Sequence, residues 1–205
     1  LGRTMALAGD IDRGIDFLGE ALAGANRLRE IDPDSSSYQE DVALYSYQLA
    51  RLRRLHGDRS GAEALVERAI TELLAMTRQD PGNVSWQREL AEARIEQAEL
   101  SRAAGKMYEA RVQAQSALTA LEPLLARQDQ DRALVLATTA ARLLVADLAS
   151  EATTAMTLRS KAMADLDSQR SGLGDPRLKS LRHSALLALA RNRQSPSLHA
   201  EPRTP

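Results

Sequence analysis

Cysteine is absent from the 205-residue sequence, and histidine occurs only three times. Without cysteine the chain forms no disulfide scaffold and no thiolate metal site. His56, His183 and His199 lie far apart, and no two have the i, i+4 spacing with which a helix presents two metal ligands. The sequence also lacks a Gly-rich phosphate loop and a Gly-x-Ser-x-Gly motif. We therefore expect no catalytic, cofactor-binding or metal-binding residues, and a function other than catalysis.

Aromatic and β-branched side chains are also scarce. Aromatic residues make up 3% of the chain, and there are only six valines and five isoleucines, against 35 alanines and 32 leucines. Strands need β-branched and aromatic side chains to cover a pleated surface, whereas alanine and leucine are strong helix formers. The composition therefore predicts an all-α protein.

The sequence has almost no net charge and no long apolar run. Its formal charge of -1 lacks the basic excess typical of a protein that binds nucleic acid. The charge-free stretch Ala133 to Ala141, in the alanine-rich second half, has only nine residues, whereas a membrane span needs about 20. We expect neither a nucleic-acid partner nor a membrane span here. The chain does not begin with Met, and we expect it to be part of a longer protein.

What the sequence does contain is an internal repeat. Asp32-Pro33 recurs 48 residues later as Asp80-Pro81, and many other positions recur at the same step without a gap. Examples are Ala50 and Ala98, Gly57 and Gly105, Ala62 and Ala110, and Ala69 and Ala117. The register predicts units at about 1–31, 32–79, 80–127 and 128–174, of which the first is partial and the fourth is degenerate.

Each clear unit is predicted to form two antiparallel helices. In the second unit the first helix runs from about Ser36 to Leu55 and the second from about Ser60 to Thr77. Gly57 lies between them, where a helix end favours the left-handed conformation. In the third unit we expect Ser85 to be the N-cap of the first helix. One pair cannot bury its apolar stripe alone, so the pairs should stack into an α-solenoid.

Two segments close the chain. A last helix, about 176–191, carries an apolar stripe with basic residues opposite, and we expect it to cap the stack. Residues 192–205 are rich in proline and serine and are predicted to be disordered. The apolar fourth unit or the last helix could instead mediate homodimerisation.

The repeat resembles the tetratricopeptide repeat (TPR), which has a small residue late in helix A, a glycine at the turn, and alanines five and twelve residues after that glycine. Ala50, Gly57, Ala62 and Ala69 fit this pattern, as do Ala98, Gly105, Ala110 and Ala117. The unit of 48 residues is longer than the TPR unit of 34, so the curvature of the family cannot be carried over. The resemblance covers roughly residues 5–166.

By this resemblance the helix A side chains line a concave face that binds a protein or peptide. The face would carry Leu44, Tyr47, Arg51 and Arg54 from one unit and Glu92, Ile95, Glu99 and Arg102 from the next. Apolar anchors among charges of both signs suit such a partner. We interpret Glu96 and Glu99 as part of a solvated or groove face, and Trp86, like Tyr38, as packing against the preceding unit.

Repeats of this kind, with an Asp-Pro turn, look like those appended to bacterial signalling proteins, including eukaryotic-like Ser/Thr kinases. The resemblance implies a sensor or scaffold region, in the cytoplasm or the periplasm. No kinase motif is present in this sequence. The alternatives are a homodimerisation module and a helical domain that senses a small molecule.

Overall fold

The computed structural model describes residues 10–169 and 175–194, the last seven of these by backbone alone. All regular secondary structure in these residues is helical, as the composition predicts. The helices are α2 (Ile11–Ile31), α3 (Ser36–His56), α4 (Arg59–Gln79), α5 (Val84–Ala103), α6 (Met107–Arg127), α7 (Arg132–Leu148), α8 (Ala152–Ser168) and α9 (Pro176–Gln194). The all-α prediction is confirmed.

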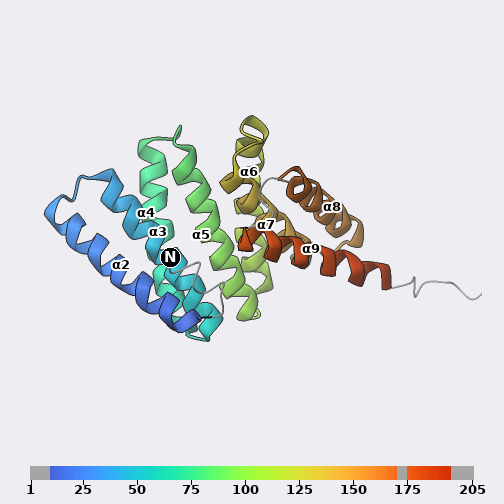
Figure 1. Cartoon of the computed structure of the whole chain (residues 1–205), viewed down its shortest axis with the longest axis horizontal. Helices are drawn as coiled ribbons and strands as arrows, with labels where there is room; N and C mark the ends of the chain where they lie inside the picture. The colour runs from blue at the N-terminus through green and yellow to red at the C-terminus, as the bar shows by residue number, and fades with distance from the viewer. Residues whose placement is uncertain (1–9, 170–174, 195–205) are drawn as a thin grey trace, which may run out of the picture.

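The helices form an array in chain order. Each packs mainly against the helix before it and the helix after it, and short turns reverse the chain between them (Figure 1). The odd-numbered helices also contact one another, α3 with α5, α5 with α7 and α7 with α9, whereas such contacts between α4, α6 and α8 are sparse. The inner, more closely spaced layer therefore consists of α3, α5, α7 and α9, and the outer layer contains α4, α6 and α8.

The turns between units repeat at the step seen in the sequence. The side-chain amide of Gln39 donates a hydrogen bond to the carbonyl of Pro33 at 2.7 Å, and Gln87 donates to Pro81 at 2.6 Å. Three backbone bonds also recur 48 residues apart, from Ser35 to Asp32, from Asn83 to Asp80 and from Asp131 to Gln128. The repeat in the sequence is therefore also a repeat in local backbone geometry.

The ends of the inner helices follow the sequence with one exception. Gly57 and Gly105 have φ angles of 96° and 74°, the left-handed conformation expected at the end of α3 and after α5. The expectation that Ser85 caps α5 was wrong. The cap is Asn83, whose side chain accepts a hydrogen bond from the backbone N–H of Trp86 at 3.1 Å. Asparagine caps as well as serine does and lies directly after the turn.

Alanine fills the places where successive helices meet. Ala50 and Ala62 pack together with Val66 and Leu100, and none of the surface of either alanine is exposed. Ala98 and Ala110 are equally buried in the largest cluster, which joins α5, α6 and α7. A methyl group takes little room, so the helices come close and the leucines around the contact exclude water.

Trp86 also packs as the repeat suggested. Its ring lies in one cluster with Leu73 and Met76 of α4, the second helix of the preceding unit. The indole N–H donates to a carboxylate oxygen of Glu40 at 2.9 Å, which satisfies the one polar atom of the ring. We therefore assign Trp86 to the core of the array.

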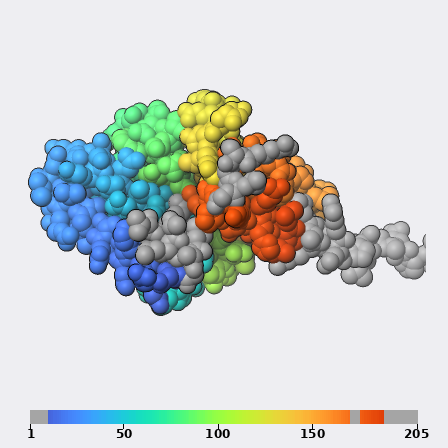
Figure 2. Space-filling view, in the orientation of Figure 1, coloured from blue at the N-terminus to red at the C-terminus, as the bar shows by residue number. Residues whose placement is uncertain are grey.

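The last helix lies across the end of the array. Leu178 and Ala185 of α9 pack in one cluster with residues of α7 and α8, and Figure 2 shows α9, in orange-red, over this part of the molecule. α9 extends to Gln194, three residues past the predicted end at 191. Residues 1–9, 170–174 and 195–205, which include most of the expected tail, lie outside the described residues.

The helix contacts predict the effect of enlarging a buried alanine. Ala98→Trp or Ala110→Trp should lower the free energy of unfolding by about 1–3 kcal/mol or more, because an indole must displace packed neighbours. Thermal melting followed by circular dichroism measures this. Ala64→Trp, at an exposed position of α4, is the matched control and should melt close to the parent. If the Ala98 and Ala110 variants had the same melting temperature as the parent, the assigned helix contacts would be wrong.

Candidate functional site

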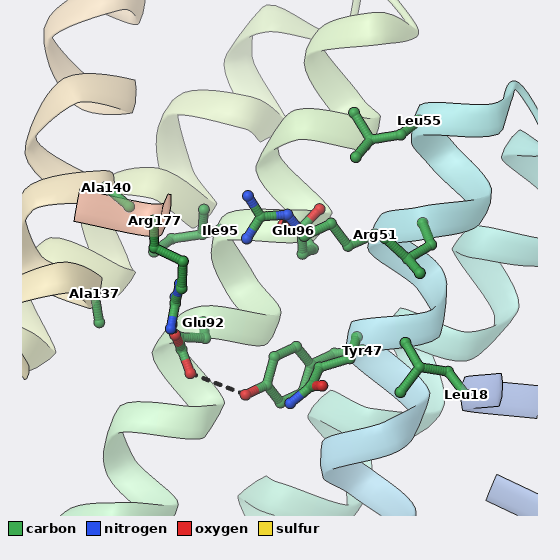
Figure 3. A pocket seen from close by; sticks show the side chains of 12 residues that line it. Leu18, Tyr47, Arg51, Leu55, Glu92, Ile95, Glu96, Ala137, Ala140 and Arg177 are labelled. Carbon is green, nitrogen blue, oxygen red and sulfur yellow. Dashed lines mark hydrogen bonds and ion pairs between the residues drawn. The ribbon is translucent and has the colours of Figure 1, made fainter. Parts of the chain in front are cut away.

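A small cavity opens on the inner layer of the array, and we call it the inner pocket. It has a volume of about 90 Å³ and lies among α2, α3, α5 and α7, with the first turn of α9 at one side (Figure 3). Five helices supply its walls. The lining residues include Leu18, Tyr47, Arg51, Leu55, Glu92, Ile95, Glu96, Ala137, Ala140 and Arg177.

The helix α5 turns a row of carboxylates toward this side. Glu89, Glu92, Glu96 and Glu99 follow one another at spacings of three and four residues, which places them on one face of the helix. The first three of these side chains are buried. A buried carboxylate is unfavourable unless hydrogen bonds and opposite charge compensate for its lost hydration. The partners of each carboxylate therefore determine what the pocket offers to a ligand.

Glu92 joins three helices. Its Oε2 accepts hydrogen bonds from the Tyr47 hydroxyl of α3 at 2.9 Å and from Arg88 at 2.8 Å. Its Oε1 accepts from the guanidinium of Arg177, in the first turn of α9, at 3.1 Å. Figure 3 shows Tyr47 and Arg177 approaching this carboxylate from opposite sides. The carboxylate of Glu92 thus ties the start of α9 to the middle of the array.

Glu96 binds two arginines of α3 that differ in exposure. Arg54 donates through Nε and Nη2 to one carboxylate oxygen, at 3.2 and 2.9 Å, and its side chain is 20% exposed. The Nε atom of Arg51 lies 3.5 Å from the other oxygen of this carboxylate, and the Arg51 side chain is 43% exposed. Arg54 therefore holds α3 against α5, whereas Arg51 still presents much of its guanidinium to solvent.

Glu89 is the least compensated carboxylate of the row. Its Oε1 accepts a hydrogen bond from Arg88 at 3.0 Å, but its buried Oε2 has no hydrogen-bond partner in the described structure. Burial is the main cause that raises the pKa of Glu89 to about 7, and the Arg88 guanidinium opposes this rise. The nearby carboxylates of Glu40 and Glu92 raise the pKa further. Glu89 therefore exchanges its proton near neutral pH.

The structure brings half of the predicted face residues together at the pocket. Tyr47, Arg51, Glu92 and Ile95 line it. Arg54 lies behind it, in its ion pair with Glu96.

Three predicted residues lie apart from the pocket lining. Leu44 is half-buried and packs on the cluster that contains Tyr47. Glu99 and Arg102 pair with each other at 2.7 Å near the C-terminal end of α5.

Sequence reasoning missed several lining residues. The spacing of Glu89, Glu92 and Glu96 was available as a signal. We interpreted Glu96 as part of a solvated or groove face, and it does line the pocket, but it is buried rather than solvated. Leu55 lies one helical turn after Arg51 and could have been found in the same way. Arg177 carries no such signal, because it is 85 residues away from Glu92.

No group of three or more His, Cys, Asp or Glu side chains is arranged to hold a metal ion in the part of the chain that the structure describes. None of the described helices is long and apolar enough to cross a membrane. Comparison of the sequence with models of protein families and with curated proteins finds no match.

The raised pKa of Glu89 predicts a pH dependence of stability. Folding favours the protonated form of Glu89. The contribution of this group to the free energy of unfolding is therefore complete below its unfolded pKa of about 4.5 and is lost as the pH rises through about 7. The full loss amounts to about 3 kcal/mol. Glu89→Gln cannot ionise, so the free energy of unfolding of the parent relative to this variant should fall between about pH 5 and about pH 8. Urea unfolding of both proteins measures the difference, and parallel pH profiles would contradict the assignment.

The two arginines of Glu96 should differ in their effect on stability. Arg54→Gln should lower the free energy of unfolding by about 2 kcal/mol, because a buried carboxylate loses two charged hydrogen bonds. Arg51→Gln should lower it by less than about 1 kcal/mol, because the side chain is partly solvated. Equilibrium urea unfolding compares them under one condition. Equal losses from the two variants would mean that Arg54 has no special structural role.

Proposed function

We propose that this chain is a non-enzymatic binding module, a TPR-like α-solenoid that captures a segment of a protein or peptide at the inner pocket. We further propose that it serves as the sensor or scaffold part of a larger bacterial signalling protein. The repeated turn hydrogen bonds and the left-handed Gly57 and Gly105 support the comparison with TPR units. The helices of 20 or 21 residues from α3 to α6 account for the longer unit.

The observation that supports the proposal best is the exposure of Arg51 and Leu55 side by side at the pocket. The two residues are one helical turn apart on α3, and they are 43% and 53% exposed at the mouth of the pocket. A partly solvated cation beside an exposed apolar side chain is complementary to a carboxylate beside an apolar side chain. The module would therefore select partner segments in which Asp or Glu neighbours a large apolar residue.

The size of the pocket favours a side chain over a whole small molecule. Its volume of about 90 Å³ is well below the 300–1,000 Å³ typical of pockets that enclose a small ligand. The buried part of the lining is largely apolar and includes Leu18, Leu52 and Ile95. A single apolar side chain from a partner would bury its surface there, while the rest of the partner stays on the surface of the array.

The proposal predicts what a random peptide library will yield. Peptides displayed on phage and selected on the immobilised protein should be enriched in Asp or Glu adjacent to Leu, Ile or Phe. Arg51→Gln or Leu55→Asn should weaken a selected peptide by about tenfold or more, since the few central contacts of an interface carry most of its energy. Fluorescence anisotropy with the labelled peptide measures the change.

The matched controls are Arg78→Gln and Leu28→Asn, which alter an exposed arginine and a half-exposed leucine outside the inner pocket. Both should bind the peptide as the parent does, and all four variants should retain the helical signal. If the selected peptides bound the Arg51 and Leu55 variants with unchanged affinity, the binding surface would lie elsewhere and the proposal would fail.

A further inference from the structure

A second, larger hollow lies on the outer side of the array, between α6 and α8, and we call it the outer groove. Its volume is about 840 Å³, within the range of pockets that hold small ligands. The walls come from α6, the end of α7 and the start of α8, and α5 contributes Arg94. It shares no residue with the inner pocket, so a ligand bound in the outer groove would be independent of the proposed function.

The outer groove lies where the chain departs from the repeat. Left-handed glycines follow the inner helices α3 and α5, but α7 ends at Leu148 and continues through Ala149 in an extended conformation. The guanidinium of Arg111, on α6, donates a hydrogen bond to the carbonyl of Leu148 at 2.8 Å. This bond provides a donor for a carbonyl group at the C-terminal end of α7, and it holds α6 and α7 together at one wall of the groove.

Arg94 is the unusual residue of the outer groove. Its side chain is half-buried, and it has neither a hydrogen bond nor an ion pair with any residue that the structure describes. Burial lowers the pKa of Arg94. The arginines of the inner pocket, in contrast, all have carboxylate partners. A partly desolvated cation without a partner is unfavourable, and an anionic ligand would compensate it.

The rest of the lining limits what that anion is. Val112, Val145 and Leu148 give the groove apolar walls, and Ser116 adds a hydroxyl group. Glu151, at the start of α8, also lines it and accepts a hydrogen bond from the Thr154 hydroxyl at 3.1 Å. A carboxylate at this position repels ligands with several negative charges. The lining therefore favours a ligand that carries a single negative charge on an otherwise apolar molecule.

We propose that the outer groove binds a small organic monocarboxylate, whose carboxylate group pairs with Arg94 and whose hydrocarbon part lies on Val112, Val145 and Leu148. The planar guanidinium offers the carboxylate two parallel hydrogen bonds, and the half-buried position strengthens them. This arrangement combines one charged contact that fixes orientation with apolar contacts that supply area.

Octanoate and 4-phenylbutyrate are suitable probes, and isothermal titration calorimetry measures their binding to the whole chain. Both should bind the parent, whereas acetate, which lacks the apolar body, and the neutral 4-phenylbutyramide should bind at least about tenfold more weakly. Arg94→Gln should weaken the binding of both probes by at least the same factor. Arg127→Gln, an exposed arginine at the other end of α6, is the matched control and should bind like the parent.

The variants separate loss of binding from loss of folding. Arg94→Gln removes an unpaired charge, so without a probe it should melt at or above the temperature of the parent. Val112→Glu changes a half-exposed position, should fold, and should also lose the probes through charge repulsion. If neither probe bound the parent, or if both bound the Arg94 and Val112 variants unchanged, the proposal would be overturned.

Discussion

The array depends on the close approach of long helices, and alanine makes this approach possible. Ala50, Ala62, Ala98 and Ala110 lie fully buried where neighbouring helices meet. Because a methyl group adds little to the helix radius, the backbones come near enough for the surrounding leucines to fill the space between them. No helix pair buries its apolar stripe alone, so the order of helices along the chain decides which side chains reach the inner layer.

The same close packing explains why charges are found inside the inner layer. α5 lies between α3 and α7, so the face that carries Glu92 and Glu96 is buried although it is acidic. Apolar residues would pack there at a smaller desolvation cost. Alanine and leucine contacts are similar in many registers, however, whereas Arg54 meets Glu96 in only one. We infer that the buried ion pairs fix the register of α3 on α5.

Sequence periodicity predicted the features that repeat, and it failed for contacts that depend on how the whole array is arranged. The helix ends at Gly57 and Gly105 and the packing of Trp86 on α4 follow from residues within one or two units. The burial of Glu96 and the arrival of Arg177 at Glu92 do not, because they depend on how far the array curves and where α9 crosses it. A pattern along one helix specifies which face is apolar, but it carries no information on which distant helix will cover its polar face.

The two candidate surfaces make opposite use of charge on the same helix. Glu92 and Glu96 point to the inner layer with their arginine partners in place. Arg94 lies between them in sequence but lines the outer groove, and it has no ion-pair partner among the residues that the structure describes. A ligand at one surface changes affinity at the other only if it shifts α5 between two arrangements. Ala91, Ala93 and Ala98 are almost wholly buried on that helix, so a shift of α5 would open voids or create clashes against its neighbours. The packing that creates both surfaces therefore opposes the movement of α5 that would couple binding at one surface to binding at the other.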